Sequence, residues 1–298
     1  MNSVAGPSIT AIGGGHGLAA TLGALRLLTP EVTAIVSIAD DGGSSGRLRS
    51  ELGIAPPGDL RKAIVALSDP ASVLARALVE RFEGGAMDGH AFGNLLIAAM
   101  VGVEGDLVRA IEEVMRLVGA VGQVVPATAS AVTLRGETAA GGVVEGQVAV
   151  MGTSGLCRVT TVPEDPEVPR EALDAIAASD ATVLGPGSLY TSVLAAAATP
   201  AVVKALADRD SPLIYICNLR PQVPETEGID AAGHLEVVRR HGIEPDVVIF
   251  DPDTICGEGL GSIGVAASLA RRSGLAHEPR ALATALASLR CWPGAGSA

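Results

Sequence analysis

The apolar residues of this 298-residue chain fall into short runs that alternate with glycine-rich loops and helix-like segments. Residues 34–39 form a nearly unbroken apolar run with three β-branched residues, which is typical of a buried parallel strand. Similar runs, which we expect to be strands of the same sheet, occupy residues 8–12, 181–184, 212–217 and 247–250. Residues 18–28 carry leucines at the spacing of one helix face. This alternation predicts an α/β fold with a doubly wound sheet of mostly parallel strands.

The region of roughly residues 60–120 contains only helical patterns. Apolar residues recur at helical spacing over residues 60–68, 72–82, 91–101 and 107–118, so we expect an additional helical layer or insertion there. Strand patterns follow at residues 123–126, 131–135, 143–150 and 158–162, and they predict a small meander or an extra sheet edge. We therefore expect a single α/β domain over residues 1–290 and a disordered tail at residues 291–298.

Composition and charge narrow the classes of partner. Hydrophobic residues make up 48% of the chain but aromatic residues only 2%, so the core must be built from Ala, Val, Leu and Ile. The net charge is −12 without a basic cluster, which argues against a nucleic acid as partner, because phosphate neutralisation needs a positive face. Exposed small-residue faces of Ala-rich helices lead us to expect a homodimer.

We expect a cytoplasmic protein without a membrane span. The amino terminus lacks a basic segment followed by a long apolar one, and no run of about 18 apolar residues appears. The four cysteines are too widely spaced for a zinc pattern, and we expect them to be reduced. They are Cys157, Cys217, Cys256 and Cys291.

The loop after the apolar run at residues 34–39 is the first candidate binding site. It consists only of carboxylate, glycine and hydroxyl residues, namely Asp40, Asp41, Gly42, Gly43, Ser44, Ser45 and Gly46. Open α/β sheets bind ligands at the carboxyl ends of their strands. Glycines let backbone N–H groups approach a phosphate, and serines add hydroxyl donors. The alternative is an Asx-type turn, which needs fewer such residues than this loop contains.

The two aspartates should have different roles, because neighbouring side chains in an extended segment point in opposite directions. We expect one of Asp40 and Asp41 to face the ligand and accept from a ribose or sugar hydroxyl, or to bind a cation. The other should accept backbone N–H groups of the loop. The sequence leaves open whether a divalent metal is bound.

A second strand-to-helix turn precedes the helical pattern at residues 18–28. It contains Gly13, Gly14, Gly15, His16 and Gly17, which would offer the N-terminus of a helix to a phosphate. His16 either donates to the ligand or faces solvent. Neither the strict dinucleotide fingerprint nor a Walker P-loop is present, which makes an NAD-dependent oxidoreductase the weaker hypothesis.

Further candidate residues follow later strands. A third strand-to-helix turn contains Gly185, Pro186, Gly187, Ser188, Tyr190 and Thr191. Of these, Gly187, Ser188 and Thr191 could bind a second phosphate or a carboxylate. Tyr190 either contacts the ligand or packs on the sheet. Asn218 follows the run at residues 212–217, and Asn94 in an apolar helix either makes a buried hydrogen bond or faces the ligand. The loops at Gly13, Asp40, Gly185 and Asn218 should meet at one sheet edge.

Five collinear segments carry a family resemblance: GGGHGLAATLGALR, IVSIADDGGSSGRLRSELGIAPPGDLRKAIVALSD, GHAFGNLLIAAM, GPGSLYTSVL and YICNLRPQVPETEG. They resemble the gluconeogenesis factor family of bacteria, which is related to 2-phospho-L-lactate transferase of deazaflavin cofactor synthesis. The resemblance implies a Rossmann-like fold and binding of a nucleotide-sugar such as UDP-N-acetylglucosamine. It also implies regulation of carbon metabolism, envelope synthesis and cell shape. The motif positions carried over are Gly13 to Gly15, Gly17, Asp40 to Ser45, Asn94, Gly185 to Ser188 and Asn218.

One position departs from the family pattern. Many relatives have Thr where this chain has His16, so a hydroxyl contact at that position is not carried over.

Two hypotheses of function follow from the resemblance. The first is a nucleotide-sugar-binding regulator. The second is a transferase that moves a phospholactate or phosphoenolpyruvyl group from a nucleotide donor, with a divalent metal to offset phosphate charge. That enzyme also needs an acceptor pocket for a flat deazaflavin, and an aromatic content of 2% offers little for stacking. The sequence assigns no catalytic residue and leaves open whether a reaction occurs.

Overall fold

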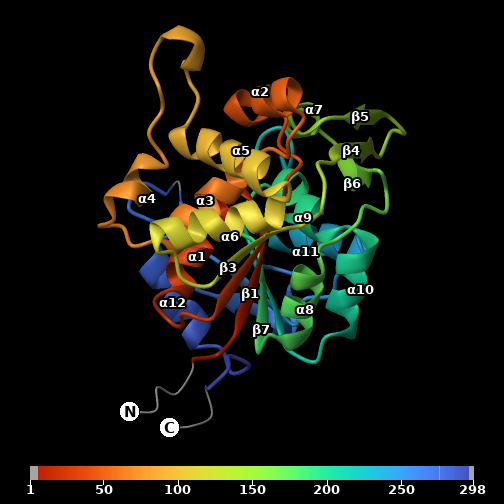
Figure 1. Cartoon of the computed structure of the whole chain (residues 1–298). Coiled ribbons are helices and arrows are strands. Elements are labelled where there is room, and N and C mark those ends of the chain that lie inside the picture. Colours follow the sequence, from red (N-terminus) through yellow and green to blue (C-terminus); the bar gives the residue numbers. More distant parts are fainter. Residues whose placement is uncertain (1–5, 275, 295–298) are drawn as a thin grey trace, which may run out of the picture.

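The computed structural model describes residues 6–274 and 276–294, and its centre is a seven-stranded sheet (Figure 1). Every pair of neighbouring strands in this sheet is parallel, and the strand order is β10-β9-β8-β7-β1-β2-β3. The strands are β1 (Ile9–Gly13), β2 (Val32–Val36), β3 (Gln123–Pro126), β7 (Ala181–Leu184), β8 (Leu213–Ile216), β9 (Val247–Phe250) and β10 (Gly264–Ala266). The predicted α/β fold with a doubly wound parallel sheet is confirmed.

The central strands are apolar because both faces of the sheet are covered. Every residue of β1, β7 and β8 is buried. Alternate residues of β1 face different layers: Ile9 and Ala11 pack with Leu22 of the first helix, whereas Ile12 packs with Leu189 on the other face. This is why these strands read as continuous apolar runs rather than as alternating ones.

Helices cover both faces of the sheet (Figure 1). One face is covered by α1 (Gly15–Leu25), α3 (Gly58–Leu67), α5 (Phe92–Glu104), α6 (Leu107–Val118) and α12 (Pro279–Ala287). The other is covered by α8 (Arg170–Ala178), η2 (Leu189–Leu194), α9 (Ala195–Ala197), α10 (Pro200–Asp208) and α11 (Ala231–Arg240). The structure also contains the helices α2 (Gly43–Leu52) and α4 (Val73–Ala77) and the short turns η1 (Gly85–Met87) and η3 (Gly261–Ile263).

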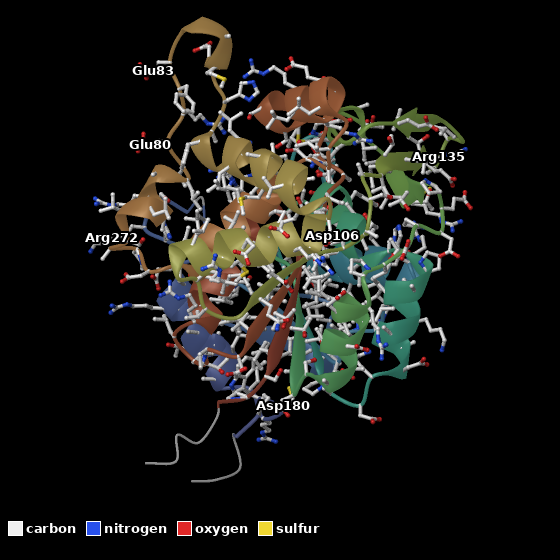
Figure 2. The ribbon with its side chains drawn as sticks, viewed as in Figure 1. Glu80, Glu83, Asp106, Arg135, Asp180 and Arg272 are labelled. Carbon is white, nitrogen blue, oxygen red and sulfur yellow. The ribbon has the colours of Figure 1, made fainter. Side chains whose placement is uncertain are left out.

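The region predicted to be helical contains α3, α4, η1, α5 and α6, all between β2 and β3. Within it, the segment between α4 and α5 extends away from the body, and Glu80 and Glu83 project outward from it (Figure 2). The loop of this segment exposes Phe82, which is 41% accessible.

A second, three-stranded antiparallel sheet has the order β5-β4-β6. It contains β4 (Thr133–Thr138), β5 (Val143–Glu145) and β6 (Leu156–Val162), with α7 (Gln147–Met151) between β5 and β6. One expectation for this region was wrong. Residues 143–150 are not one strand, because β5 ends at Glu145 and α7 begins two residues later. Of the two alternatives for residues 123–126, the sheet edge is correct, because β3 pairs with β2 at the edge of the main sheet.

Near the end of the chain, Trp292 is buried in the core that contains α1 and α12. The last residues of the predicted disordered tail, 295–298, lie outside the described residues. No single helix of the described part is long and apolar enough to cross a membrane. Two consecutive helical segments, Leu189–Ala197 and Pro200–Asp208, are long and apolar enough only when they are taken together, and the chain bends by 72° between them.

Candidate functional site

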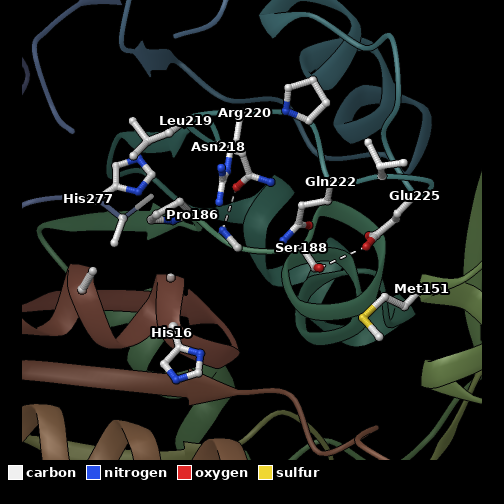
Figure 3. Close-up of a pocket in the computed structure, with 16 residues that line it drawn as sticks. His16, Met151, Pro186, Ser188, Asn218, Leu219, Arg220, Gln222, Glu225 and His277 are labelled. Carbon is white, nitrogen blue, oxygen red and sulfur yellow. Dashed lines mark hydrogen bonds between the residues drawn. The ribbon is translucent and has the colours of Figure 1, made fainter. Parts of the chain in front are cut away.

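A pocket of about 600 Å³ opens where the strand order reverses, between β1 and β7. Crevices at such switch points are where open α/β sheets bind ligands. The pocket is lined by His16, Gly17, Ala20, Met151, Pro186, Gly187, Ser188, Asn218, Leu219, Arg220, Pro221, Gln222, Val223, Glu225, Ala276 and His277. The loops after β1, β7 and β8 therefore meet in one cavity, and His16 lies across it from the loop that carries Asn218 and Arg220 (Figure 3). The loop at Asp40 is not among the lining residues.

The first turn of α1 forms one wall of this pocket. Gly15 has φ +65°, a conformation that favours glycine, and its N–H donates to Asp59 Oδ2 over 2.8 Å. Gly17 packs directly on the loop after β7, since an added Cβ would overlap the Pro186 carbonyl. Because first-turn N–H groups have no partner within their helix, the amides of His16 and Gly17 present donors and the positive end of the helix dipole.

The opposite wall is the loop after β7, and a buried carboxylate holds it in place. Glu225 is 2% exposed and accepts from the Ser188 hydroxyl over 3.0 Å. It also accepts from the N–H groups of Tyr190, over 2.7 Å, and Thr191, over 3.1 Å. Burial raises the pKa of Glu225, while these hydrogen bonds favour the charged form. Glu225 therefore fixes the shape of this wall.

Sequence reasoning missed Glu225. It is one acidic residue within the Pro-containing segment after Asn218, and no local pattern separates it from a solvated loop carboxylate. Only the fold brings it to Ser188, 37 positions earlier.

Asn218 provides an unused donor in the same pocket. Its Oδ1 accepts from the Gly187 N–H over 3.0 Å, which fixes the orientation of the amide. Its Nδ2 is buried and has no hydrogen-bond partner in the described structure, although the residue lines the pocket. An unpartnered buried donor is costly, so an acceptor that reached this N–H₂ group would be favoured there.

The charge of the pocket is carried by few groups. Arg220 is the one Lys or Arg among the described lining residues, and it is exposed. Burial lowers the pKa of His277 to about 4, so this ring is neutral at pH 7. Burial, followed by the charge of Lys62, also lowers the pKa of His16. A bound anion would therefore be held by backbone N–H groups, the Asn218 amide and Arg220.

The loop after β2 makes mainly internal contacts. Asp41 accepts from the N–H groups of Gln147, over 2.8 Å, and Val148, over 3.0 Å, at the start of α7. Asp40 Oδ1 accepts from the Gly42 N–H over 3.0 Å. Burial raises the pKa of Asp40, and the charge of Asp59 adds to the increase. Asp41 thus joins the loop to α7, whereas Asp40 accepts an N–H of its own loop and lies near Asp59 of α3.

The serines of this loop and Asn94 form a buried network. The Ser44 hydroxyl is 3.0 Å from His90 Nδ1 and accepts from Asn94 Nδ2 over 3.0 Å. Asn94 Oδ1 accepts from Arg61 Nε over 2.9 Å. Ser45 Oγ accepts from a backbone N–H at the start of α3 over 3.1 Å. These side chains join α2, α3 and α5 rather than line the pocket.

Two residues expected at the ligand lie in the core. Tyr190 is fully buried, and its hydroxyl donates to the Leu156 carbonyl over 2.7 Å. Burial raises its pKa to about 12. Thr191 is 2% exposed, and its hydroxyl is within 3.3 Å of Glu225. Their side chains support the loop after β7 from behind.

In the described residues, no three His, Cys, Asp or Glu side chains come together to hold a metal ion. The carboxylate of Asp40 lies close enough to Asp59 for that charge to raise the pKa of Asp40. A divalent ion there would need further oxygen ligands from a bound phosphate.

Comparison with known proteins gives consistent results. Residues 9–260 match the family model described as 2-phospho-L-lactate transferase CofD. The chain is 40% identical to the gluconeogenesis factor of Halalkalibacterium halodurans over 247 residues, 81% of this chain and 77% of that one. It is 41% identical to a putative gluconeogenesis factor of Mycobacterium leprae over 309 residues, covering 95% and 86% of the two chains. A crystal structure of a Bacillus halodurans protein superposes with a TM-score of 0.89 at 35% identity, covering 95% of this chain and 99% of that one.

Proposed function

The chain belongs to the family of the 2-phospho-L-lactate transferase model and the gluconeogenesis factors, and we propose that it is a nucleotide-sugar-binding regulator of carbon metabolism and envelope synthesis. The ligand class is UDP-N-acetylglucosamine or a close relative. The observation that carries the proposal is the buried, unpartnered Nδ2 of Asn218, a residue that lines the pocket bounded by the first turn of α1.

A diphosphate fits the polar groups of this pocket. The amides of His16 and Gly17 supply donors and the positive end of a helix dipole, which together favour a phosphate. Arg220 adds a full positive charge with a planar donor fork. Asn218 Nδ2 supplies a fourth donor from the facing loop.

The rest of the pocket fits a nucleoside and a sugar. Its volume of about 600 Å³ lies within the usual range of about 300–1,000 Å³ for small-molecule sites. Apolar side chains such as Leu219, Val223 and Met151 offer contacts to a base or an acetyl group. Gln222 and Ser188 offer polar groups to hydroxyls.

A transferase would bind its nucleotide donor in this same pocket, and the match to the transferase family model supports that part of the alternative. It also requires a surface for a flat deazaflavin acceptor. None of the described lining residues is Phe, Tyr or Trp, so stacking would fall to His16 or His277. This composition favours the binding protein over the transferase.

Titration calorimetry with UDP-N-acetylglucosamine, UDP-glucose, UDP, GTP and NAD tests the proposal. We expect saturable 1:1 binding of the UDP-sugars and at least about tenfold weaker binding of GTP and NAD. The variant Arg170→Ala, which removes an exposed arginine paired with Asp174, should bind like the wild type. Preferential binding of GTP, with turnover when a phospholactate donor and deazaflavin acceptor are added, would favour the transferase instead.

A further inference from the structure

A second cavity, of about 630 Å³, lies at the far end of α1. Its walls come from the end of α1, the end of α3, the region of α4 and the segment that leads into α12. Its lining residues include Gly23, Val65, Ala66, Val79 and Pro279. None of them lines the first pocket.

Four arginines surround this cavity: Arg26, Arg76, Arg271 and Arg280. They stand out in a chain whose net charge is −12 and which has only 21 Lys and Arg residues. In the described part of the chain, Arg76, Arg271 and Arg280 form no ion pair, whereas Arg116, Arg170, Arg239 and Arg240 each do. Arg272, the next residue after Arg271, projects outward on the side where α4 lies (Figure 2).

The fourth arginine, Arg26, makes hydrogen bonds to backbone carbonyls. The one acidic side chain among the described lining residues, Glu278, caps a helix. Arg26 Nη1 donates to the carbonyls of Ala66, over 3.3 Å, and Ser68, over 2.5 Å. Glu278 accepts from the Ala281 N–H over 2.7 Å as the N-cap of α12. The N-terminus of α12 is thus capped by Glu278, and the positive charge at the cavity comes from the three guanidinium groups that form no ion pair within the described residues.

Between the arginines, the lining is apolar. Leu27 and Val79 are exposed by 58% and 45%, and Val65, Ala66 and Pro279 form the rest of the surface. Guanidinium groups bind carboxylate and phosphate oxygens in a bidentate manner. Burial of the apolar surface between them by a hydrocarbon group would add favourable free energy of binding. We propose that this cavity binds a small organic anion with an apolar body, held by Arg76, Arg271 and Arg280.

The two cavities are built on the same two segments. Ala20 of α1 lines the first pocket, and Gly23, one turn later, lines the second. Likewise His277 lines the first and Glu278 the second. The anion site is therefore separate from the nucleotide-sugar pocket, and its ligand contacts the helix whose first turn bounds that pocket.

Titration calorimetry with hexyl phosphate tests this site, with inorganic phosphate and 1-hexanol as probes of the two halves of the ligand. We expect saturable 1:1 binding of hexyl phosphate and at least tenfold weaker binding of either half. The double variant Arg76→Ala/Arg280→Ala should bind hexyl phosphate at least tenfold more weakly. Gly23→Leu, which places a side chain in the cavity, should do the same, and thermal melting checks that it folds.

Two control variants locate the binding. Arg170→Ala removes an arginine elsewhere on the surface, and Arg220→Ala removes the arginine of the first pocket; both should bind hexyl phosphate like the wild type. The proposal fails if hexyl phosphate does not bind at millimolar concentration. It fails equally if 1-hexanol binds as well, if the double variant binds unchanged, or if Arg220→Ala abolishes binding.

Discussion

Asp40 and Asp41 are adjacent in the sequence but differ in the contacts of their carboxylates. Asp41 accepts two backbone N–H groups at the start of α7, 106 and 107 positions away. Asp40 accepts one N–H within its own turn and lies near Asp59. Both carboxylates therefore accept backbone N–H groups, and the expectation that one of them faces a ligand stays a prediction, for which Asp40, with fewer such contacts, is the candidate.

Alanine substitution should separate the two roles. Asp41→Ala leaves two N–H groups of α7 without an acceptor and should lower the free energy of unfolding by about 1–2 kcal/mol, the usual cost of losing a helix cap. Asp40→Ala should weaken UDP-N-acetylglucosamine binding about tenfold with a smaller effect on stability. Chemical denaturation and calorimetry measure the two effects. Equal stability losses with unchanged affinity in both variants would show that this loop is purely structural.

His234 predicts a pH-dependent stability. It is fully buried beside Tyr215, and burial lowers its pKa from 6.5 to about 4. A neutral folded histidine contributes stability above the unfolded pKa, and that contribution is lost as pH falls from 6.5 to 4. The loss is about 3 kcal/mol. The pKa values of Asp40 and Glu225 are raised, so these two groups increase the stability of the protein as the pH falls. The effect of His234 is therefore isolated by comparison with a variant that lacks it.

His234→Phe removes this titration and leaves the acidic groups in place. We expect the wild type to lose its stability advantage over the variant between pH 6.5 and 4, measured by urea denaturation at each pH. A constant difference across this range would show that His234 does not titrate in this way.

At the scale of elements, two glycines of α1 predict opposite effects of the same substitution. An alanine Cβ at Gly23 would meet only Pro279, at 3.7 Å, which is ordinary contact. Gly23→Ala should therefore stabilise the protein by about 0.5–1 kcal/mol, as expected inside a helix. A Cβ at Gly17 would overlap the Pro186 carbonyl and lie 2.8 Å from Gly187 Cα. Gly17→Ala should therefore separate α1 from the loop after β7 and abolish nucleotide-sugar binding.

Thermal melting and calorimetry of both variants check this pair. A Gly17→Ala protein with normal affinity would mean that the contact between α1 and the loop after β7 does not shape the pocket.

The sequence predicted helices and strands correctly where the pattern within the segment is sufficient to define the element. The strands β1, β2, β7 and β8 are buried on both faces, so their apolar runs are unambiguous. It failed at α7, because the acceptor for the first N–H groups of that helix is Asp41, which is distant in sequence. It left open whether residues 123–126 join a meander or a sheet edge, since this is decided by pairing with β2 rather than by local pattern.

The same distinction applies to the site. The loops at Gly17, Gly187 and Asn218 could be placed together because parallel strands bring their carboxyl ends to one edge. The inward position of Tyr190 and the role of Glu225 could not, because both depend on which side of a loop faces the pocket.

At the scale of the whole molecule, the expectation of a homodimer stays a prediction. Large apolar side chains are exposed on α5 and α6, where Val103 is 76% and Leu117 is 46% accessible. We expect light scattering at micromolar concentration to give twice the chain mass of 29.8 kDa. A mass of one chain would contradict it.

The central claim is that the pocket between β1 and β7 binds a nucleotide-sugar through donors that include Asn218 Nδ2. Asn218→Asp keeps the oxygen that accepts from Gly187 but replaces the free donor with a negatively charged acceptor. Titration calorimetry of UDP-N-acetylglucosamine into the wild type and this variant is the most direct test. We expect saturable binding to the wild type and at least about tenfold weaker binding to the variant, the cost of losing a hydrogen bond to a charged group. Equal affinity in the two folded proteins, or no binding to either, would contradict the claim.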